Sequence, residues 1–113
     1  MGKQSFRLED IIEKAKKAQK ATGEVKLFKR PIKFLVHPEV EMLEEREAKL
    51  YSAEFTFDID GEIYHVSKTY VIEFKTENPE DIMLNRNIAN ARLKDDYKRL
   101  KDAGIEITEK YFD

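Results

Sequence analysis

The stretch KLYSAEFTFDIDGEIYHVSKTYVIEFK, residues 49–75, decides how this chain folds. Two runs of alternating apolar and polar residues meet at Asp60-Gly61. Asp-Gly between such runs is typical of a type I′ turn, because both central residues of that turn need positive φ. The stretch therefore predicts one long β-hairpin.

The turn also predicts which residues lie opposite each other, because the register of a hairpin follows from its turn. Counting outward from Ile59 and Glu62, the expected pairs are Phe57–Tyr64, Phe55–Val66, Ala53–Lys68 and Tyr51–Tyr70. One face of the hairpin is then largely apolar. The other face carries Ser52, Glu54, Thr56, Asp58, His65, Ser67, Thr69, Val71 and Glu73.

Before the hairpin we expect one helix and one strand. Apolar residues at helical spacing predict a helix over residues 8–21, and Gly23 is placed to end it. Residues 25–36 alternate like a strand, in which Pro31 requires a sheet edge or a break. Residues 39–48 fit a charged loop, a helical turn or the start of the hairpin's first strand.

After the hairpin, Asn78-Pro79 is a strong helix start, with an N-cap residue followed by proline. The helix is expected to run to about Ala103, where Gly104 ends it. Its predicted buried stripe comprises Ile82, Ala89, Leu93, Tyr97, Leu100 and Ala103. Residues 105–112 predict a final strand.

The resulting order of elements is helix, three strands, helix, strand, which predicts an α+β (α/β-like) fold in a single domain over residues 1–113. The three strands form an antiparallel meander. A helix between two strands allows a crossover that returns the last strand beside the third. We therefore expect a mixed sheet flanked by helices.

The composition excludes several classes of chemistry. The chain has no cysteine, so it has no disulfide, thiolate metal site or cysteine nucleophile. No apolar run approaches the roughly 18 residues of a membrane span, and the first residues do not resemble a signal peptide. We expect a cytoplasmic protein without a membrane partner.

The net charge of −2 is unevenly distributed along the chain. Residues 1–36 hold ten Lys/Arg against four Asp/Glu, a net +6, while residues 37–82 hold four against thirteen, a net −9. A basic surface can bind phosphate, so candidate nucleic-acid contacts are Lys16, Lys17, Lys29 and Arg30. The acidic middle suits a metal or a basic partner, and both charged regions also fit a plain solvated surface.

The better candidate for chemistry lies at the end of the hairpin, although a Glu-x-Lys spacing alone is unspecific because it occurs by chance on many strands. Glu73 and Lys75 are two residues apart and point to the same side of one strand, and the predicted register puts Glu54 on that face. Paired carboxylates bind Mg²⁺ through hard oxygen ligands, and a nearby lysine can stabilise the charge that develops in phosphodiester cleavage.

With this pattern, the order of elements resembles the PD-(D/E)xK (restriction-endonuclease-like) nuclease superfamily. Val71-Ile72-Glu73-Phe74-Lys75-Thr76 is similar to its (D/E)xK strand, and Tyr51-Ser52-Ala53-Glu54-Phe55 resembles the acid-bearing strand of compact phage Holliday-junction-resolvase-like members. The resemblance implies a Mg²⁺-dependent nuclease, with Glu73 and Glu54 as metal ligands and catalytic residues and Lys75 as the catalytic lysine.

The spacing departs from that family. In the predicted register Glu54 pairs with Ser67, about six residues or ~20 Å along the strand from Glu73. Glu47 is then the nearer acid, but it reaches the correct face only if a bulge shifts the register. Either the active site is built from Glu47, Glu73 and Lys75, or the fold is kept and the active site is degenerate.

Two functions remain open at this point. The first is a nuclease-like nucleic-acid-binding domain, active with Mg²⁺ or degenerate. The second is a non-catalytic α+β protein-interaction module, either a small homo-oligomer such as a homodimer or an inhibitor that docks on a partner through its acidic middle.

Overall fold

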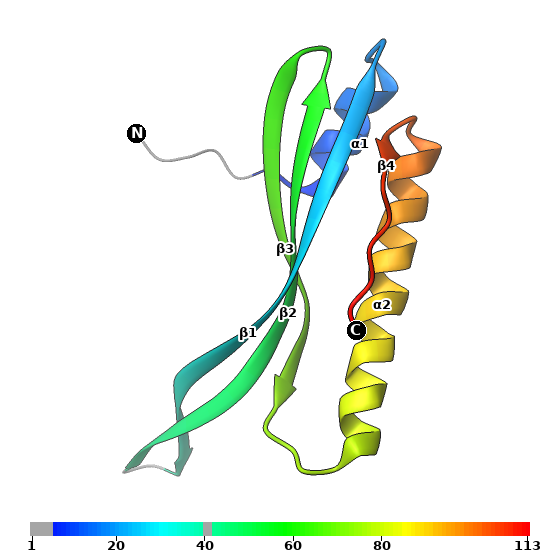
Figure 1. Cartoon of the computed structure of the whole chain (residues 1–113). Helices are drawn as coiled ribbons and strands as arrows, with labels where there is room; N and C mark the ends of the chain where they lie inside the picture. Colours follow the sequence, from blue (N-terminus) through cyan, green and yellow to red (C-terminus); the bar gives the residue numbers. More distant parts are fainter. Residues whose placement is uncertain (1–5, 40–41) are drawn as a thin grey trace.

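The computed structural model describes residues 6–39 and 42–113, with side chains for residues 6–35 and 45–113. Figure 1 shows its elements, which are α1 (Leu8–Lys16), β1 (Ala21–Glu39), β2 (Met42–Ile59), β3 (Glu62–Phe74), α2 (Pro79–Asp102) and β4 (Glu106–Ile107). The predicted α+β class and the antiparallel meander are confirmed. Residues 42–48 begin the hairpin's first strand, and residues 40 and 41 lie outside the described part.

The four strands are ordered β3-β2-β1-β4, and β4 runs parallel to β1. The expected position of the last strand beside the third was therefore wrong. The reason is that α2 runs alongside the sheet, so that the chain returns at the β1 edge (Figure 1). The last strand is also shorter than residues 105–112, since only Thr22 and Gly23 of β1 pair with it.

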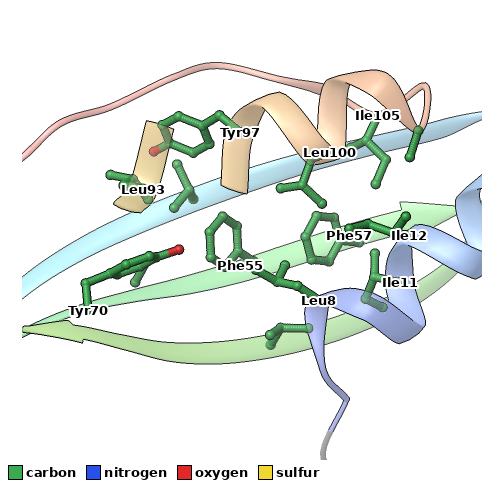
Figure 2. Close-up of a cluster of buried hydrophobic side chains, with 14 of the residues drawn as sticks. Leu8, Ile11, Ile12, Phe55, Phe57, Tyr70, Leu93, Tyr97, Leu100 and Ile105 are labelled. Carbon is green, nitrogen blue, oxygen red and sulfur yellow. The ribbon is translucent and has the colours of Figure 1, made fainter. Parts of the chain in front are cut away.

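Both helices pack against the same face of the sheet, so the mixed sheet has one covered and one open face. Figure 2 shows Ile11 and Ile12 of α1, Leu100 of α2 and Phe57 of β2 in one buried cluster. Full burial of each such side chain contributes roughly 1.5–3 kcal/mol to folding. The fully buried large residues are Tyr97, Phe55, Phe57, Ile11, Leu93, Leu100 and Ile105.

The predicted Asp60-Gly61 turn is confirmed, with φ values of 51° and 90°. The pairs nearest the turn, from Phe57–Tyr64 to Ala53–Lys68, are also as predicted. The Asp60 carboxylate accepts hydrogen bonds from the backbone N–H groups of Gln19 (3.1 Å) and Lys20 (2.9 Å). The hairpin turn thus holds the segment between α1 and β1.

Further from the turn, a β-bulge changes the register of β3. Tyr51 lies opposite Val71 while Ser52 lies opposite Thr69, so the predicted Tyr51–Tyr70 pair was wrong and Tyr70 is an extra residue. Because side chains alternate between the faces of a strand, one extra residue exchanges the faces beyond it. Val71 and Glu73, predicted on the polar face, are instead buried.

The first helix ends earlier than predicted, at Lys16, because the following amides donate to Asp60 and leave the helix. Gly23, predicted to end this helix, lies within β1. A Cβ atom at Gly23 would lie 2.9 Å from Cδ1 of Phe57 and 3.4 Å from Cγ2 of Ile105. The missing side chain thus makes room for a core ring and for the segment that leads into β4.

The second helix starts and ends as predicted. The side chain of Asn78 accepts a hydrogen bond from the Glu80 N–H at 3.0 Å, and Gly104 has a φ of 86° just beyond the helix. The buried stripe is confirmed from Ala89 onward. Ile82 was wrongly predicted as buried, since it is 40% exposed.

The first strand is longer than residues 25–36, and it continues through Pro31 without a break. Beyond Gly23, β1 has a paired neighbour only on the β2 side within the described residues. Pro31 therefore lies at a sheet edge, as predicted. At that edge no neighbouring strand needs a hydrogen bond from its missing N–H.

The close contact at Gly23 gives a first prediction. Gly23→Ala should lower the free energy of unfolding by about 1–3 kcal/mol, because the new methyl group overlaps the Phe57 ring. Urea denaturation followed by circular dichroism measures this change. In a Phe57→Leu background the same substitution should cost clearly less, and an equal cost in both backgrounds would contradict the assigned overlap.

Candidate functional site

A cavity of about 340 Å³ lies at the end of the sheet remote from the Asp60-Gly61 turn. It is formed where β1, β2, the end of β3 and the first turns of α2 meet. Its lining residues are Pro31, Ile32, Lys33, Glu47, Ala48, Lys49, Glu73, Phe74, Lys75, Thr76 and Ile82. Three predicted site residues, Glu47, Glu73 and Lys75, are thus brought to one cavity.

A row of alternating charges crosses the strands at this cavity. Lys33 lies opposite Glu47, and the Lys75 N–H donates to the Glu47 carbonyl oxygen at 3.3 Å. The Glu47 carboxylate lies 4.0 Å from Lys33 Nζ and 3.9 Å from Lys75 Nζ. All three side chains are more than half exposed, so each ion pair contributes at most about 1 kcal/mol.

Glu73 is the buried acid of the cavity, only 4% exposed. It reaches this position because of the bulge at Tyr70, and its Oε2 accepts a hydrogen bond from the Tyr51 hydroxyl at 3.2 Å. Burial, followed by the charge of Glu73 and this hydrogen bond, raises the pKa of Tyr51. Tyr51 therefore stays protonated at neutral pH and remains a donor to Glu73.

Glu54 lies apart from this group. It is exposed and lies opposite Ser67, while its strand neighbours Ala53 and Phe55 are buried in the helix-covered face. Its Oε1 is 3.4 Å from Nη2 of Arg30. Glu54 and Glu73 are therefore on opposite faces of the sheet, and the structure does not bring them together.

The four predicted nucleic-acid contacts do not share one surface. Lys29 and Arg30 are consecutive in β1 and point to opposite faces; Lys29 Nζ donates to the Asp113 carbonyl oxygen and lies 5.7 Å from the Tyr51 ring centre. Arg30 lies 4.0 Å from the Phe28 ring centre. Lys16 and Lys17 are at the end of α1, where Lys16 pairs with Glu13 at 3.6 Å.

A second buried acid, Asp96, was missed by sequence reasoning. Its carboxylate accepts hydrogen bonds from the Tyr70 hydroxyl and Lys68 Nζ, both at 2.6 Å, and from Arg99 Nη1 at 3.5 Å. Burial and the hydrogen bond to Asp96 raise the pKa of Tyr70 strongly. Asp96 sits three residues after Leu93 on the buried side of α2, which is the one sequence signal of its burial. With three donors, it serves as a structural tie between β3 and α2.

The cavity offers Mg²⁺ a limited set of ligands. Glu47 and Glu73 are two carboxylates, but Glu47 pairs with two lysines and Glu73 accepts from Tyr51. Among the described residues, no group of three or more His, Asp or Glu is arranged to hold a metal ion. Within the described residues the cavity therefore offers Mg²⁺ two carboxylates, each already engaged by another side chain.

Comparison with known proteins yields no relative: no family model, no curated protein and no solved structure matches the chain. In the part of the chain that the structure describes, neither helix is long and apolar enough to cross a membrane.

The buried Tyr51–Glu73 contact gives a second prediction. Tyr51→Phe should lower the free energy of unfolding by about 1–3 kcal/mol, because it removes a donor from a buried carboxylate. Tyr64→Phe is a matched control, since the Tyr64 hydroxyl donates to the exposed Glu62 at 2.5 Å and its loss should cost little. If the two substitutions lower the free energy of unfolding equally in thermal and urea denaturation, the Tyr51–Glu73 hydrogen bond contributes no more to stability than the exposed Tyr64–Glu62 hydrogen bond.

Proposed function

We propose that this protein is a non-catalytic interaction module that binds another protein through one end. Within the described residues, six of the eight exposed large hydrophobic side chains belong to the segments that meet at the cavity end, which are β1 near Leu35, the end of β3 and the first turns of α2. They define the distal surface, which comprises Leu35, Ile72, Phe74, Ile82, Met83 and Leu84. Ile63 and Tyr111 are the other two.

The distal surface is the observation that carries this proposal. It exists because β3 is shorter than β1 and β2. β3 ends at Phe74, opposite Ala48, while β1 and β2 continue beyond it as a two-stranded arm (Figure 1). α2 likewise begins beyond the core. Phe74 contacts the Phe34 ring, with ring centres 5.8 Å apart, yet it is still 55% exposed.

The chemistry around the distal surface suits a protein partner. Large exposed apolar patches with a polar rim are typical of protein-binding sites. Here Phe74 and Ile82 line the same cavity as Lys33, Glu47 and Lys75, whose alternating charges can form hydrogen bonds and ion pairs at a rim. A cytoplasmic setting, which the lack of cysteine favours, belongs to the same proposal.

A photocrosslinking experiment tests the proposal. With p-benzoylphenylalanine in place of Met83, irradiation in extract of the cells that produce the protein should give one dominant protein adduct, identified by mass spectrometry. The same group in place of Ile63 should not give it, because Ile63 is equally exposed (56% against 55%) but lies at the opposite end. If neither position gives an adduct, or both give the same set, the distal surface is not a binding site.

A second candidate is the nuclease-like function, which is favoured by the common cavity of Glu47, Glu73 and Lys75. In this reading the two carboxylates would hold Mg²⁺ together with substrate phosphate oxygens, as Mg²⁺ sites with few protein ligands do. Lys75 would then stabilise charge on the phosphate. The separation of the basic residues over several surfaces makes this the weaker candidate.

The nuclease candidate predicts Mg²⁺-dependent nicking of supercoiled DNA, measured by gel electrophoresis. Glu73→Gln and Lys75→Ala should abolish nicking, whereas Glu54→Ala should leave it unchanged because Glu54 lies on the opposite face. Binding of nucleic acid should weaken steeply as salt increases. If the protein causes no mobility shift of DNA or RNA at low salt, this candidate is wrong.

A further inference from the structure

We infer that the protein bound at the distal surface is a second copy of this chain. This inference rests on the proposed function and names its partner. Three features of the molecule support it, namely its total surface, the shape of the distal end and the balance of charges there.

The first feature is the surface of the single chain. Its accessible surface is 8532 Å², counted over all 113 residues, whereas a compact monomer of 13.3 kDa exposes about 6,500 Å². The radius of gyration is 17.1 Å, against about 13 Å for a compact chain of this length. An extended chain of this kind exposes more surface than a compact monomer, as is expected of a chain that packs against a second copy.

The second feature is that a projection and a cavity lie side by side. In a two-fold dimer the same patch faces itself, so each copy must offer both a knob and a hole. Leu35 of the arm is 63% exposed and lies two residues, or about 7 Å, beyond the cavity-lining Lys33. The cavity has apolar walls that include Ile32, Phe74 and Ile82. Leu35 of each copy can therefore enter the cavity of the other.

The third feature is charge. The ionisable residues that line the cavity are Lys33, Lys49 and Lys75 against Glu47 and Glu73. A nearly balanced set with alternating signs does not select a strongly acidic or basic partner, but it can pair with its own copy when the strands run in opposite directions.

The exposed edge of β3 is a less suitable place for self-association. The bulge at Tyr70 interrupts this edge, and Arg92 Nη1 donates to the Tyr70 carbonyl oxygen at 2.7 Å. Bulges and covered backbone groups discourage pairing between sheet edges. The two copies are therefore expected to meet through the distal surface and not through a continuous sheet.

Sedimentation equilibrium of the full chain tests the inference between about 1 and 200 µM, a range that brackets a micromolar dissociation constant. The expected result is a species of twice the 13.3 kDa chain mass. Leu35→Glu and Ile82→Lys should each weaken the dimer at least tenfold, because each places a charge in an apolar contact. Ile63→Glu, a substitution of a similarly exposed residue outside the distal surface, should leave the dimer unchanged, and circular dichroism checks that all variants fold.

Mixing the Leu35→Glu and Ile82→Lys chains is the sharpest experiment. If Leu35 of one copy enters the cavity of the other, the new glutamate and lysine face each other across the interface and the mixture should dimerise more tightly than either variant alone. A mixture as weak as its components would overturn this arrangement.

Two other outcomes separate this inference from the proposed function. In the first outcome, the wild-type chain remains monomeric at 200 µM while the group at Met83 crosslinks to a different protein. This result overturns the inference of a second copy but supports the interaction module. A monomeric chain without any adduct at Met83 overturns both.

Discussion

The β-bulge at Tyr70 is the local feature on which the rest of the sheet's packing depends. The extra residue turns Val71 and Glu73 from the open face to the covered face, and it leaves Tyr70 itself buried beside α2. Three contacts then become available: Tyr70 to Asp96, Arg92 to the Tyr70 carbonyl oxygen, and Tyr51 to Glu73. Without the bulge, Glu73 would lie on the same face as Glu54, and the cavity would have no buried acid.

The parts of the fold that could be predicted are those specified by neighbouring residues. Asp60-Gly61 can adopt the positive φ values of its turn, so it determines the hairpin register up to Ala53–Lys68. Asn78 and Pro79 likewise mark the start of α2, because an N-cap acceptor and a residue without an N–H suit the first turn of a helix. These signals act over a few residues and do not depend on the tertiary structure.

The errors share a different cause, which is contact between residues that are distant in the sequence. Gly23 has the form of a helix stop, but its lack of a side chain accommodates Phe57 and Ile105, which come from β2 and from the segment after α2. The alternating pattern breaks at the consecutive apolar residues Tyr70, Val71 and Ile72, but such a run fits either face of the sheet and does not by itself predict a bulge. The edge chosen by β4 depends on the path of α2 over the sheet. Glu47, Glu73 and Lys75 could be named as one alternative from the sequence. The role of Asp96 was missed because its partners Lys68 and Tyr70 come from β3, which is distant in the sequence.

The distal end has fewer stabilising contacts within its own chain than the rest of the molecule has. Near the turn, two helices cover three strands, and most apolar residues of that face are buried. Beyond Phe74 the described part of the sheet narrows to the two strands β1 and β2, and a two-stranded ribbon alone is marginally stable in water. Leu35 and the first turns of α2 can lose their contact with water only against another surface. Binding there would bury this apolar area and stabilise the arm at once, so the folding of the arm and its recognition of a partner are expected to be thermodynamically linked.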